Sequence, residues 1–352
     1  MMAMGDGWCV RSVRILMVSL IVLSAAGCKK DSESDTSDLV GNWFKRSDFE
    51  GVPRSAAVAF TIGTRAYVCL GYDGKDRLTD LWEFDTEINN WVRKADFPGA
   101  ARTGAVAFAI GSKGYVGTGY DGTTRLKDFY EFDPATNSWA RVADFGGTAR
   151  YGAVGFAISG KGFLCSGDDG NFQKDLWEYD RTSDQWTQKV SLSGAKRRSA
   201  VAFVIDGKAY VCTGVNNGAY ENDLWAYDPT TNAWTGKRAI ANVSSDEYDD
   251  DYADIVGTSK VAFVIGSKGY VATGGQGTTG SSVWEYDPAS DLWTGRTGLE
   301  ASARMEAVGF AIGIHGYIAT GRSGSYYFDD LWGFEPGATQ VDLDKPGTIV
   351  DP

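Results

Sequence analysis

The chain has 352 residues, of which 43% are hydrophobic and 13% aromatic. Its net charge is −12 and its isoelectric point lies near 4.7, which argues against a nucleic-acid partner because phosphate binding relies on a basic face. The same acidity helps to keep an exported protein soluble.

The first predicted segment is a lipoprotein signal peptide over residues 1–27. Arg11 and Arg14 precede an apolar stretch, residues 15–26, that is shorter than the about twenty residues a membrane-spanning helix needs. The small residues before Cys28 resemble a bacterial lipobox, in which the cysteine becomes the lipidated first residue of the mature protein. We therefore expect lipidation at Cys28, with ordinary signal cleavage beside an incidental cysteine as the alternative.

Residues 28–39 are polar and lack aromatic side chains, so they predict a flexible tether. In bacterial lipoproteins an aspartate after the lipidated cysteine favours the inner membrane. Lys29 stands there instead, and this resemblance implies an outer-membrane lipoprotein that is either periplasm-facing or at the cell surface. The acidic residues that follow are interpreted either as a surface-export signal or as a solvated linker. Membrane contact is expected through the lipid alone.

A unit similar to Asp-Leu-Trp-Glu-Tyr-Asp occurs six times in the rest of the chain. The tryptophans that close five copies are spaced by 48, 47, 48 and 59 residues; they are Trp91, Trp139, Trp186, Trp234 and Trp293. Each unit can be divided into four short strands that are rich in β-branched and aromatic residues. A period of about 50 residues with this patterning predicts the blades of a β-propeller.

The last copy has no closing tryptophan strand, whereas an unpartnered one, residues 41–44, lies at the start of the repeats. If this N-terminal strand pairs with the last blade, six blades close into a ring without exposed edges. We therefore predict an all-β, six-bladed propeller over residues 40–338, followed by a loose C-terminal tail at residues 339–352.

This pattern resembles the kelch repeat family over about residues 41–335. The resemblance lies in an arginine that opens the first strand, a Tyr-Val-x-x-Gly strand, a Trp-x-Tyr-Asp strand and the closing tryptophan. The chain departs from the family's usual double glycine, because outside blade five only the second glycine is kept. The resemblance implies a kelch-type propeller but no single function, since kelch propellers serve as enzymes and as binding scaffolds.

Three cysteines, Cys69, Cys165 and Cys212, occupy one equivalent position in three blades, where the other blades carry glycine or alanine. A position that takes only small residues predicts buried thiols, so we expect neither disulfides nor metal there. The single histidine, His315, is expected in a tight turn on the face away from the long loops. No metal and no cofactor are therefore expected.

The long predicted loops, such as residues 72–79 and 95–102, leave on one face of the ring, here named the loop face. We expect the functional site there, around the central channel. Five blades open the innermost strand with an arginine: Arg54, Arg102, Arg150, Arg197 and Arg304. The same five blades begin the third strand with an aspartate. Two interpretations remain open, namely a guanidinium ring that binds a carboxylate and a repeated Arg–Asp pair that holds the loops.

Blade five departs from the pattern. The loop before it contains residues 245–254, with six carboxylates and two tyrosines, interpreted as a calcium site, a partner contact or a solvated loop. Lys260 and Glu306 replace small residues in blades five and six. Strand alternation predicts that they meet as an ion pair near the channel, either structural or part of a ligand site.

Our main hypothesis is a lipid-anchored, monomeric binding or scaffold protein that recognises a protein or a glycan through the loop face. Tyr72 and Tyr120 are candidate sugar contacts, with turn geometry as their alternative role. The chain is also similar to the six-bladed bacterial kelch protein that epimerises sialic acid. That resemblance implies an epimerase or mutarotase acting on an acidic sugar, for which Glu306 and Arg304 are the only catalytic candidates. A copper oxidase is not expected, because copper needs imidazole ligands.

Overall fold

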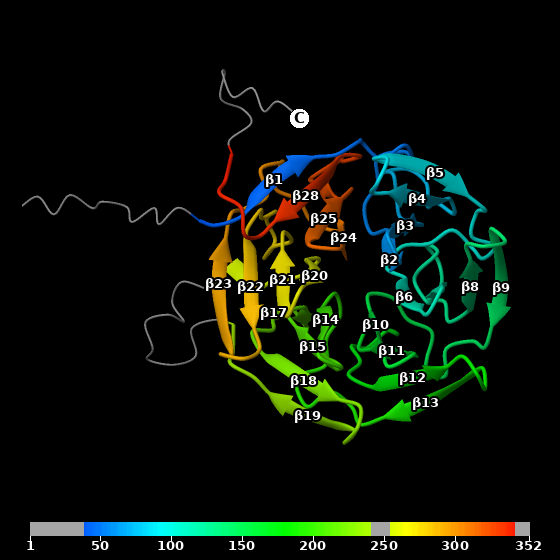
Figure 1. Cartoon of the computed structure of the whole chain (residues 1–352). Helices are drawn as coiled ribbons and strands as arrows, with labels where there is room; N and C mark the ends of the chain where they lie inside the picture. The colour runs from blue at the N-terminus through cyan, green and yellow to red at the C-terminus, as the bar shows by residue number, and fades with distance from the viewer. Residues whose placement is uncertain (1–38, 241–253, 342–352) are drawn as a thin grey trace, which may run out of the picture. The chain divides into compact units, whose positions relative to one another are not determined.

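The described residues form a ring of six antiparallel, four-stranded sheets (Figure 1). The computed structural model describes residues 39–240 and 254–341, and within these ranges the elements are strands, with no α-helix. Each sheet is one blade, whose first strand lines the central channel and whose fourth strand lies at the rim (Figure 1). The predicted all-β, six-bladed propeller is confirmed.

Blades one to three each consist of four consecutive strands of five residues. They contain β2 (Val58–Ile62), β3 (Arg65–Cys69), β4 (Leu81–Asp85), β5 (Asn90–Lys94), β6 (Val106–Ile110), β7 (Lys113–Gly117), β8 (Phe129–Asp133), β9 (Ser138–Val142), β10 (Val154–Ile158), β11 (Lys161–Cys165), β12 (Leu176–Asp180) and β13 (Gln185–Lys189).

Blades four to six have the same order, and blades four and six carry an extra hairpin between their second and third strands. Blades four and five contain β14 (Val201–Ile205), β15 (Lys208–Cys212), β18 (Leu224–Asp228), β19 (Ala233–Gly236), β20 (Val261–Ile265), β21 (Lys268–Ala272), β22 (Val283–Asp287) and β23 (Leu292–Arg296). Blade six contains β24 (Val308–Ile312), β25 (His315–Ala319), β28 (Leu331–Glu335) and β1 (Asn42–Lys45). The hairpins are β16 (Val215–Asn216) with β17 (Ala219–Tyr220), and β26 (Arg322–Ser323) with β27 (Tyr326–Tyr327).

The N-terminal strand β1 closes the ring. It pairs antiparallel with β28, and Trp43 lies opposite Phe334. Trp43 is fully buried, and its indole Nε1 donates a hydrogen bond to the Thr297 carbonyl of blade five at 3.0 Å. The predicted closure of the last blade by the N-terminal strand is therefore confirmed, and the closing strand also binds the neighbouring blade.

Main-chain hydrogen bonds of 2.7–3.1 Å join every blade to the next. In each, a glycine N–H after the second strand donates to a carbonyl at the start of the following blade; the pairs are Gly71–Arg102, Gly119–Arg150, Gly167–Arg197, Gly214–Gly257, Gly274–Arg304 and Gly321–Arg54. These glycines have φ between 70° and 107°, a conformation that side chains disfavour. This requirement explains why glycine repeats at this position.

Aromatic side chains fill the space between neighbouring blades. Phe60 of β2 stacks on Tyr67 with ring centroids 4.9 Å apart, and its far edge lies against Gly114 of β7. A Cβ at Gly114 would overlap the Phe60 ring, so this strand position accepts only the smallest residues. Cys165 and Cys212 are buried free thiols at the ends of second strands, and burial raises the pKa of each to about 12.

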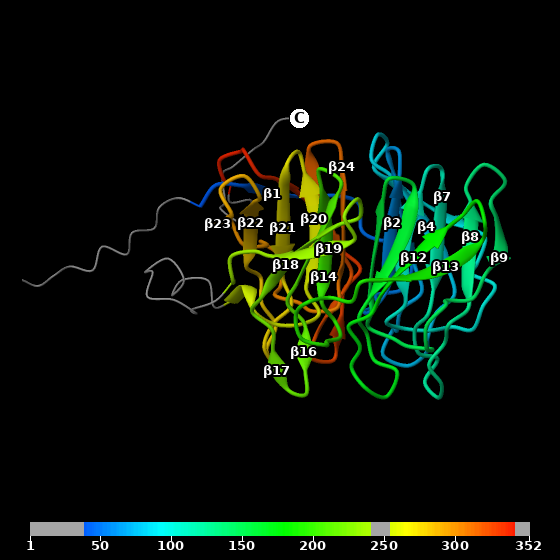
Figure 2. The same ribbon diagram turned by 90° about the horizontal axis from the view of Figure 1, so that it is seen from below.

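Seen from the side, the hairpin β16–β17 projects from one face of the ring together with the loops between second and third strands (Figure 2). This is the loop face. His315 lies on the other side of blade six, as the first residue of β25, with its ring edge-on to Phe44. Among the described residues, no helix is long and apolar enough to cross a bilayer.

Candidate functional site

The repeated arginines are buried and bound to the repeated aspartates. In blade two, Arg102 donates from Nη1 and Nη2 to Asp128 at 2.6 and 2.8 Å, and from Nη1 to the Thr118 carbonyl at 3.0 Å. Its guanidinium lies 4.9 Å from the Phe97 ring centroid. The Asp pairing and the carbonyl contact recur at four further arginines, all at most 1% exposed: Arg54, Arg150, Arg197 and Arg304.

This geometry corrects the hypothesis of a ligand-binding guanidinium ring. In each of these side chains Nε, Nη1 and Nη2 donate to carbonyls and an aspartate inside the loops, and the side chains are at most 1% exposed, so they do not face a ligand in the channel. It also corrects the catalytic pairing of Glu306 with Arg304, because Arg304 is fully buried against Asp330. The arginines hold each blade's loops together, which is the alternative that the sequence left open.

Blade five keeps the same contacts with different residues. Lys260 Nζ donates to the Thr273 carbonyl at 2.8 Å, the position that arginine contacts in the other blades, and to the Asp254 carbonyl at 3.0 Å. Asp254 accepts from the Trp284 indole at 2.7 Å, as Asp330 does from Trp332. Lys260 is 8% exposed, and burial lowers its pKa to about 8. Lys260 and Asp254 thus take the places of the missing arginine and aspartate, with a bond from Lys260 to the Asp254 main-chain carbonyl in place of the ion pair.

The predicted ion pair between Lys260 and Glu306 was wrong. In the described part of the chain, Glu306 accepts instead from Arg322 Nε at 2.7 Å, Arg322 Nη2 at 3.2 Å and Ser55 Oγ at 3.0 Å. Glu306 precedes β24 and has a φ of 57°, in the left-handed region. Strand alternation does not apply to a residue with that backbone, so its side chain turns toward the loop face.

Twelve residues surround the channel opening on the loop face, here named the mouth ring. Each blade contributes two of them, joined by an isolated antiparallel bridge: Ser55–Tyr72, Thr103–Tyr120, Tyr151–Asp168, Arg198–Val215, Thr258–Gly275 and Met305–Arg322. The architecture around these positions is repeated in all six blades, but the side chains at the positions differ from blade to blade. A varied set on a repeated frame is the arrangement expected of a recognition site.

Tyrosines and arginines alternate along one half of the channel opening. They are here named the Tyr–Arg belt and are Tyr72, Arg77, Tyr120, Arg125, Tyr151 and Arg198. The guanidinium of Arg77 lies 5.6 Å from the Tyr72 ring and 5.4 Å from the Tyr120 ring. The hydroxyls of both tyrosines donate within their own loops, to the Gly74 and Gly122 carbonyls at 2.9 and 2.8 Å. The two predicted sugar contacts therefore brace their turns, while their half-buried rings remain part of the loop face.

The belt continues into blades three and four. Arg125 Nη2 and Arg198 Nη1 donate to Asp168 at 3.0 and 3.2 Å, and Arg198 also contacts the Tyr151 hydroxyl. Burial and the nearby Asp168 raise the pKa of Tyr151 above its usual value, although Arg198 opposes the shift. One carboxylate thus fixes two arginines and a neutral tyrosine.

The other half of the mouth ring is hollow. A cavity of about 790 Å³ lies over blades four to six and is bordered by Tyr151. Arg198 and Arg322 line it with a single carboxylate, Glu306; its remaining wall is rich in glycine, serine and threonine. The hydrogen bond to Glu306 raises the pKa of Arg322. Arg125, Arg198 and Arg322 share two carboxylates, Asp168 and Glu306, and this excess of one positive charge makes the hollow attractive to an anionic group, although the chain as a whole is acidic.

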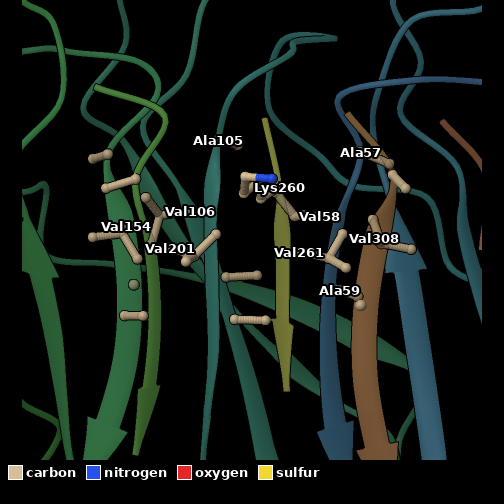
Figure 3. A pocket seen from close by; sticks show the side chains of 18 residues that line it. Ala57, Val58, Ala59, Ala105, Val106, Val154, Val201, Lys260, Val261 and Val308 are labelled. Carbon is tan, nitrogen blue, oxygen red and sulfur yellow. The ribbon is translucent and has the colours of Figure 1, made fainter. Parts of the chain in front are cut away.

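Below the mouth ring the channel narrows to a cavity of about 210 Å³. Valine, alanine and glycine from the innermost strands of all six blades line it, together with Lys260 (Figure 3). The site therefore has two levels, the hollow at the mouth and the smaller cavity in the channel.

Sequence reasoning missed Tyr151, Arg198, Asp168 and Arg322. The available signal was their irregularity, because each differs from its counterparts in an otherwise repeated position. The residues that repeat, such as the arginines, are buried and hold the loops together.

Several expectations fall on residues outside those described: the signal peptide, lipidation at Cys28, the tether up to residue 38, residues 245–253 of the acidic loop and the tail beyond residue 341. Within the described residues, no group of three or more His, Cys, Asp or Glu side chains is arranged to hold a metal ion.

The fold and its repeated contacts define a six-bladed β-propeller, and two stretches of the chain match models of kelch repeats. The KLHDC2/KLHL20/DRC7 Kelch-repeats domain model matches residues 42–167, and the Kelch motif model matches residues 196–236. No curated protein matches the sequence. A solved structure described as "Structure of YjhT" has a TM-score of 0.69 and 17% identity, covering 81% of this chain and 95% of that one. At this identity the likeness shows the fold alone.

Proposed function

We propose that this protein is a kelch-propeller binding protein whose loop face recognises an anionic glycan. The observation that carries the proposal is the 790 Å³ hollow, which is lined by Arg198 and Arg322 and by one carboxylate, Glu306. Its volume lies within the range of small-ligand sites, which is about 300–1,000 Å³. Fixed arginines suit carboxylates because the guanidinium offers paired donors.

The arginines of the hollow are held in place before any ligand arrives. Arg322 is anchored by Glu306, and Arg198 is anchored by Asp168 and Tyr151. A side chain that is already ordered loses less conformational entropy on binding. The half-buried rings of Tyr151 and Tyr220 at the wall offer apolar faces to a sugar ring.

A kelch propeller is a general scaffold for protein partners as well. A hollow of 790 Å³ favours a glycan over a flat protein surface here, and a protein partner is the outcome that remains if no sugar binds. We further propose that the protein is monomeric and anchored in the outer membrane through lipid at Cys28. Replacement of Cys28 by serine should then release it from the membrane fraction, whereas unchanged fractionation would contradict the anchor.

An epimerase or mutarotase acting on an acidic sugar is the second candidate, because Glu306 places a carboxylate in the wall of the hollow beside Arg322 and Ser55. A carboxylate in this position can move a proton to or from a sugar hydroxyl. Exchange spectroscopy on anomers of glucuronic acid tests it. Acceleration that is lost in Glu306→Gln supports the enzyme, and unchanged exchange contradicts it.

The binding proposal is tested by differential scanning fluorimetry with matched acidic and neutral sugars. Glucuronic acid and its oligomers should raise the melting temperature saturably, whereas glucose and maltose should not. Arg198→Gln and Arg322→Gln should weaken the response, while Arg93→Gln, which alters an exposed ion pair with Asp96 on the rim, should preserve it. Equal responses to acidic and neutral sugars would contradict recognition of an anionic group.

A further inference from the structure

Arg77 is the arginine of the Tyr–Arg belt that has no ion pair. Arg125 and Arg198 both bind Asp168, whereas Arg77 forms neither an ion pair nor a side-chain hydrogen bond within the described residues. Its Nε is buried without a partner. A guanidinium carries five N–H donors and a permanent charge, so an arginine without any acceptor is unusual in a folded protein.

The neighbouring blade shows which partner is missing. Arg77 and Arg125 occupy equivalent positions, each bridged to the residue that follows the second strand of its own blade, Tyr72 or Tyr120. The equivalent residue of the next blade is Tyr120 for Arg77 and Asp168 for Arg125. Arg125 donates from Nε to the Asp168 carbonyl at 3.1 Å and from Nη2 to its carboxylate at 3.0 Å. At Arg77, a tyrosine ring therefore takes the place of the carboxylate that Arg125 binds.

The guanidinium of Arg77 is nevertheless held in place. It lies 5.6 Å from the Tyr72 ring and 5.4 Å from the Tyr120 ring, and Nη1 lies against Gly122, where a Cβ would overlap it. Nη1 and Nη2 have no acceptor in the described part of the chain and, unlike Nε, are not buried. An arginine that aromatic rings already order loses little conformational entropy when its free donors bind an anion.

The aspartates of the two surrounding turns do not take this role. Asp73 and Asp121 accept hydrogen bonds of 2.6–2.8 Å from main-chain N–H groups of their own turns. Hydrogen bonds from Thr124 and Thr123 lower the pKa of Asp121, and the charge of Arg77 adds to this effect. Asp121 thus feels the charge of Arg77 without accepting a hydrogen bond from it.

We propose that Arg77, held between Tyr72 and Tyr120, binds a carboxylate group of a ligand at the loop face, in the role that Asp168 has for Arg125. Two N–H donors of a guanidinium match the two oxygens of a planar carboxylate. The carboxylate has two sources, a free carboxylic acid or the acid group of a longer ligand that also occupies the hollow. The subsite lies on blades one and two, whereas the hollow lies over blades four to six, so the proposal does not depend on the proposed glycan.

NMR of the arginine Nε–H groups in the full chain tests the subsite. The Arg77 resonance is assigned by its loss in Arg77→Lys. Acetate should shift this resonance saturably, whereas acetamide, which has a similar shape without the charge, should not. Arg125, whose Nε and Nη2 are already bonded to Asp168, is the internal control, and its resonance should move far less. An Arg77 resonance that acetate leaves in place, or that acetamide moves equally, would overturn the proposal.

Tyr120→Asp supplies the carboxylate that blade three has at this position. The new side chain should pair with Arg77 and weaken acetate binding about tenfold or more relative to Tyr120→Asn, its uncharged counterpart of the same size. Both variants lose the same ring and the same hydroxyl bond to Gly122, so a loss of order in the loop affects them alike. Equal affinities of the two variants for acetate would refute the site.

If both Tyr120 variants fail to fold by circular dichroism, Arg77→Gln replaces them. Saturation transfer from the protein to acetate should then fall about tenfold or more, and unchanged transfer would count against the subsite.

A glucuronic-acid oligomer distinguishes the two sources of the carboxylate. A shift of the Arg77 resonance that is lost in Arg198→Gln identifies the acid group of a ligand that also occupies the hollow. A shift by acetate without a shift by the oligomer identifies a free carboxylic acid, and this outcome holds even where the glycan proposal fails.

Discussion

Replacing Arg102 by methionine removes the cation of one Arg–Asp pair while keeping most of its apolar contact with Phe97. The change leaves Asp128 without its two guanidinium bonds and leaves the Thr118 and Ala100 carbonyls without their donors. Breaking a buried ion pair on one side costs about 3–5 kcal/mol. Because the Asp128 side chain is 18% exposed, we expect the lower end, about 3 kcal/mol.

For roughly 300 ordered residues, 3 kcal/mol corresponds to a fall in melting temperature of about 5 °C. Scanning calorimetry measures it, with Arg93→Met as the matched control: Arg93 is 57% exposed and its bond to Asp96 should contribute under about 1 kcal/mol. Arg102→Met/Asp128→Leu should regain at least half of the loss, since an apolar replacement of both partners leaves no unpaired charge. A loss in Arg102→Met no larger than in Arg93→Met would refute the structural role of the pair.

Three further predictions concern stability. Burial raises the pKa of Asp80, but the hydrogen bonds and charge of Arg54 outweigh it and hold this pKa below 3.8. The Arg54–Asp80 pair therefore stabilises the fold above that pH, and this stabilisation is lost as pH falls through the folded-state pKa. Denaturant unfolding at pH 7 and pH 3 should show a smaller loss of unfolding free energy in Asp80→Asn than in wild type. Burial lowers the pKa of Lys260 from 10.5 to about 8, so between these pH values the unfolded chain holds a proton that the folded chain has lost. The unfolding free energy of wild type, relative to Lys260→Met, should therefore rise by about 3 kcal/mol from pH 8 to pH 10.5. A difference in unfolding free energy that stays constant with pH would contradict the burial of Lys260 as a cation. Trp43→Ala should cost about 3–5 kcal/mol in the same assay and more than Trp234→Ala, whose indole is only half-buried; equal costs would argue against the closing strand.

The architecture could be predicted from the sequence because it is periodic. The strand of Trp43 precedes the first complete repeat, and the last repeat has no closing tryptophan strand. The pairing of β1 with β28 therefore follows from counting repeats. The Arg–Asp pairs follow in the same way, since blade five lacks both members. What repeats in a propeller is what every blade needs, namely buried contacts within and between sheets.

The site could not be predicted to the same degree, because its residues do not repeat. Asp254 lies before the first strand of blade five, whereas the repeated aspartates lie before third strands, yet it accepts the same tryptophan hydrogen bond. No periodicity in the sequence marks this residue. The prediction for Glu306 failed because its left-handed backbone carries the side chain out of the strand pattern. Tyr151 and Arg198 stand at positions filled by Ser55 or Thr103 elsewhere, and only the closed ring shows that these positions meet around one opening.

We propose that Arg198 and Arg322 make the hollow of the loop face a receptor for an anionic sugar. Isothermal titration of a glucuronic-acid oligomer and of its neutral glucose counterpart, into wild type, Arg198→Gln and Arg322→Gln, tests it most directly. We expect the acidic oligomer alone to bind, and each substitution to weaken its binding about tenfold or more, which corresponds to at least about 1.4 kcal/mol. Acidic and neutral oligomers that bind alike, or binding that both variants retain in full, would contradict it.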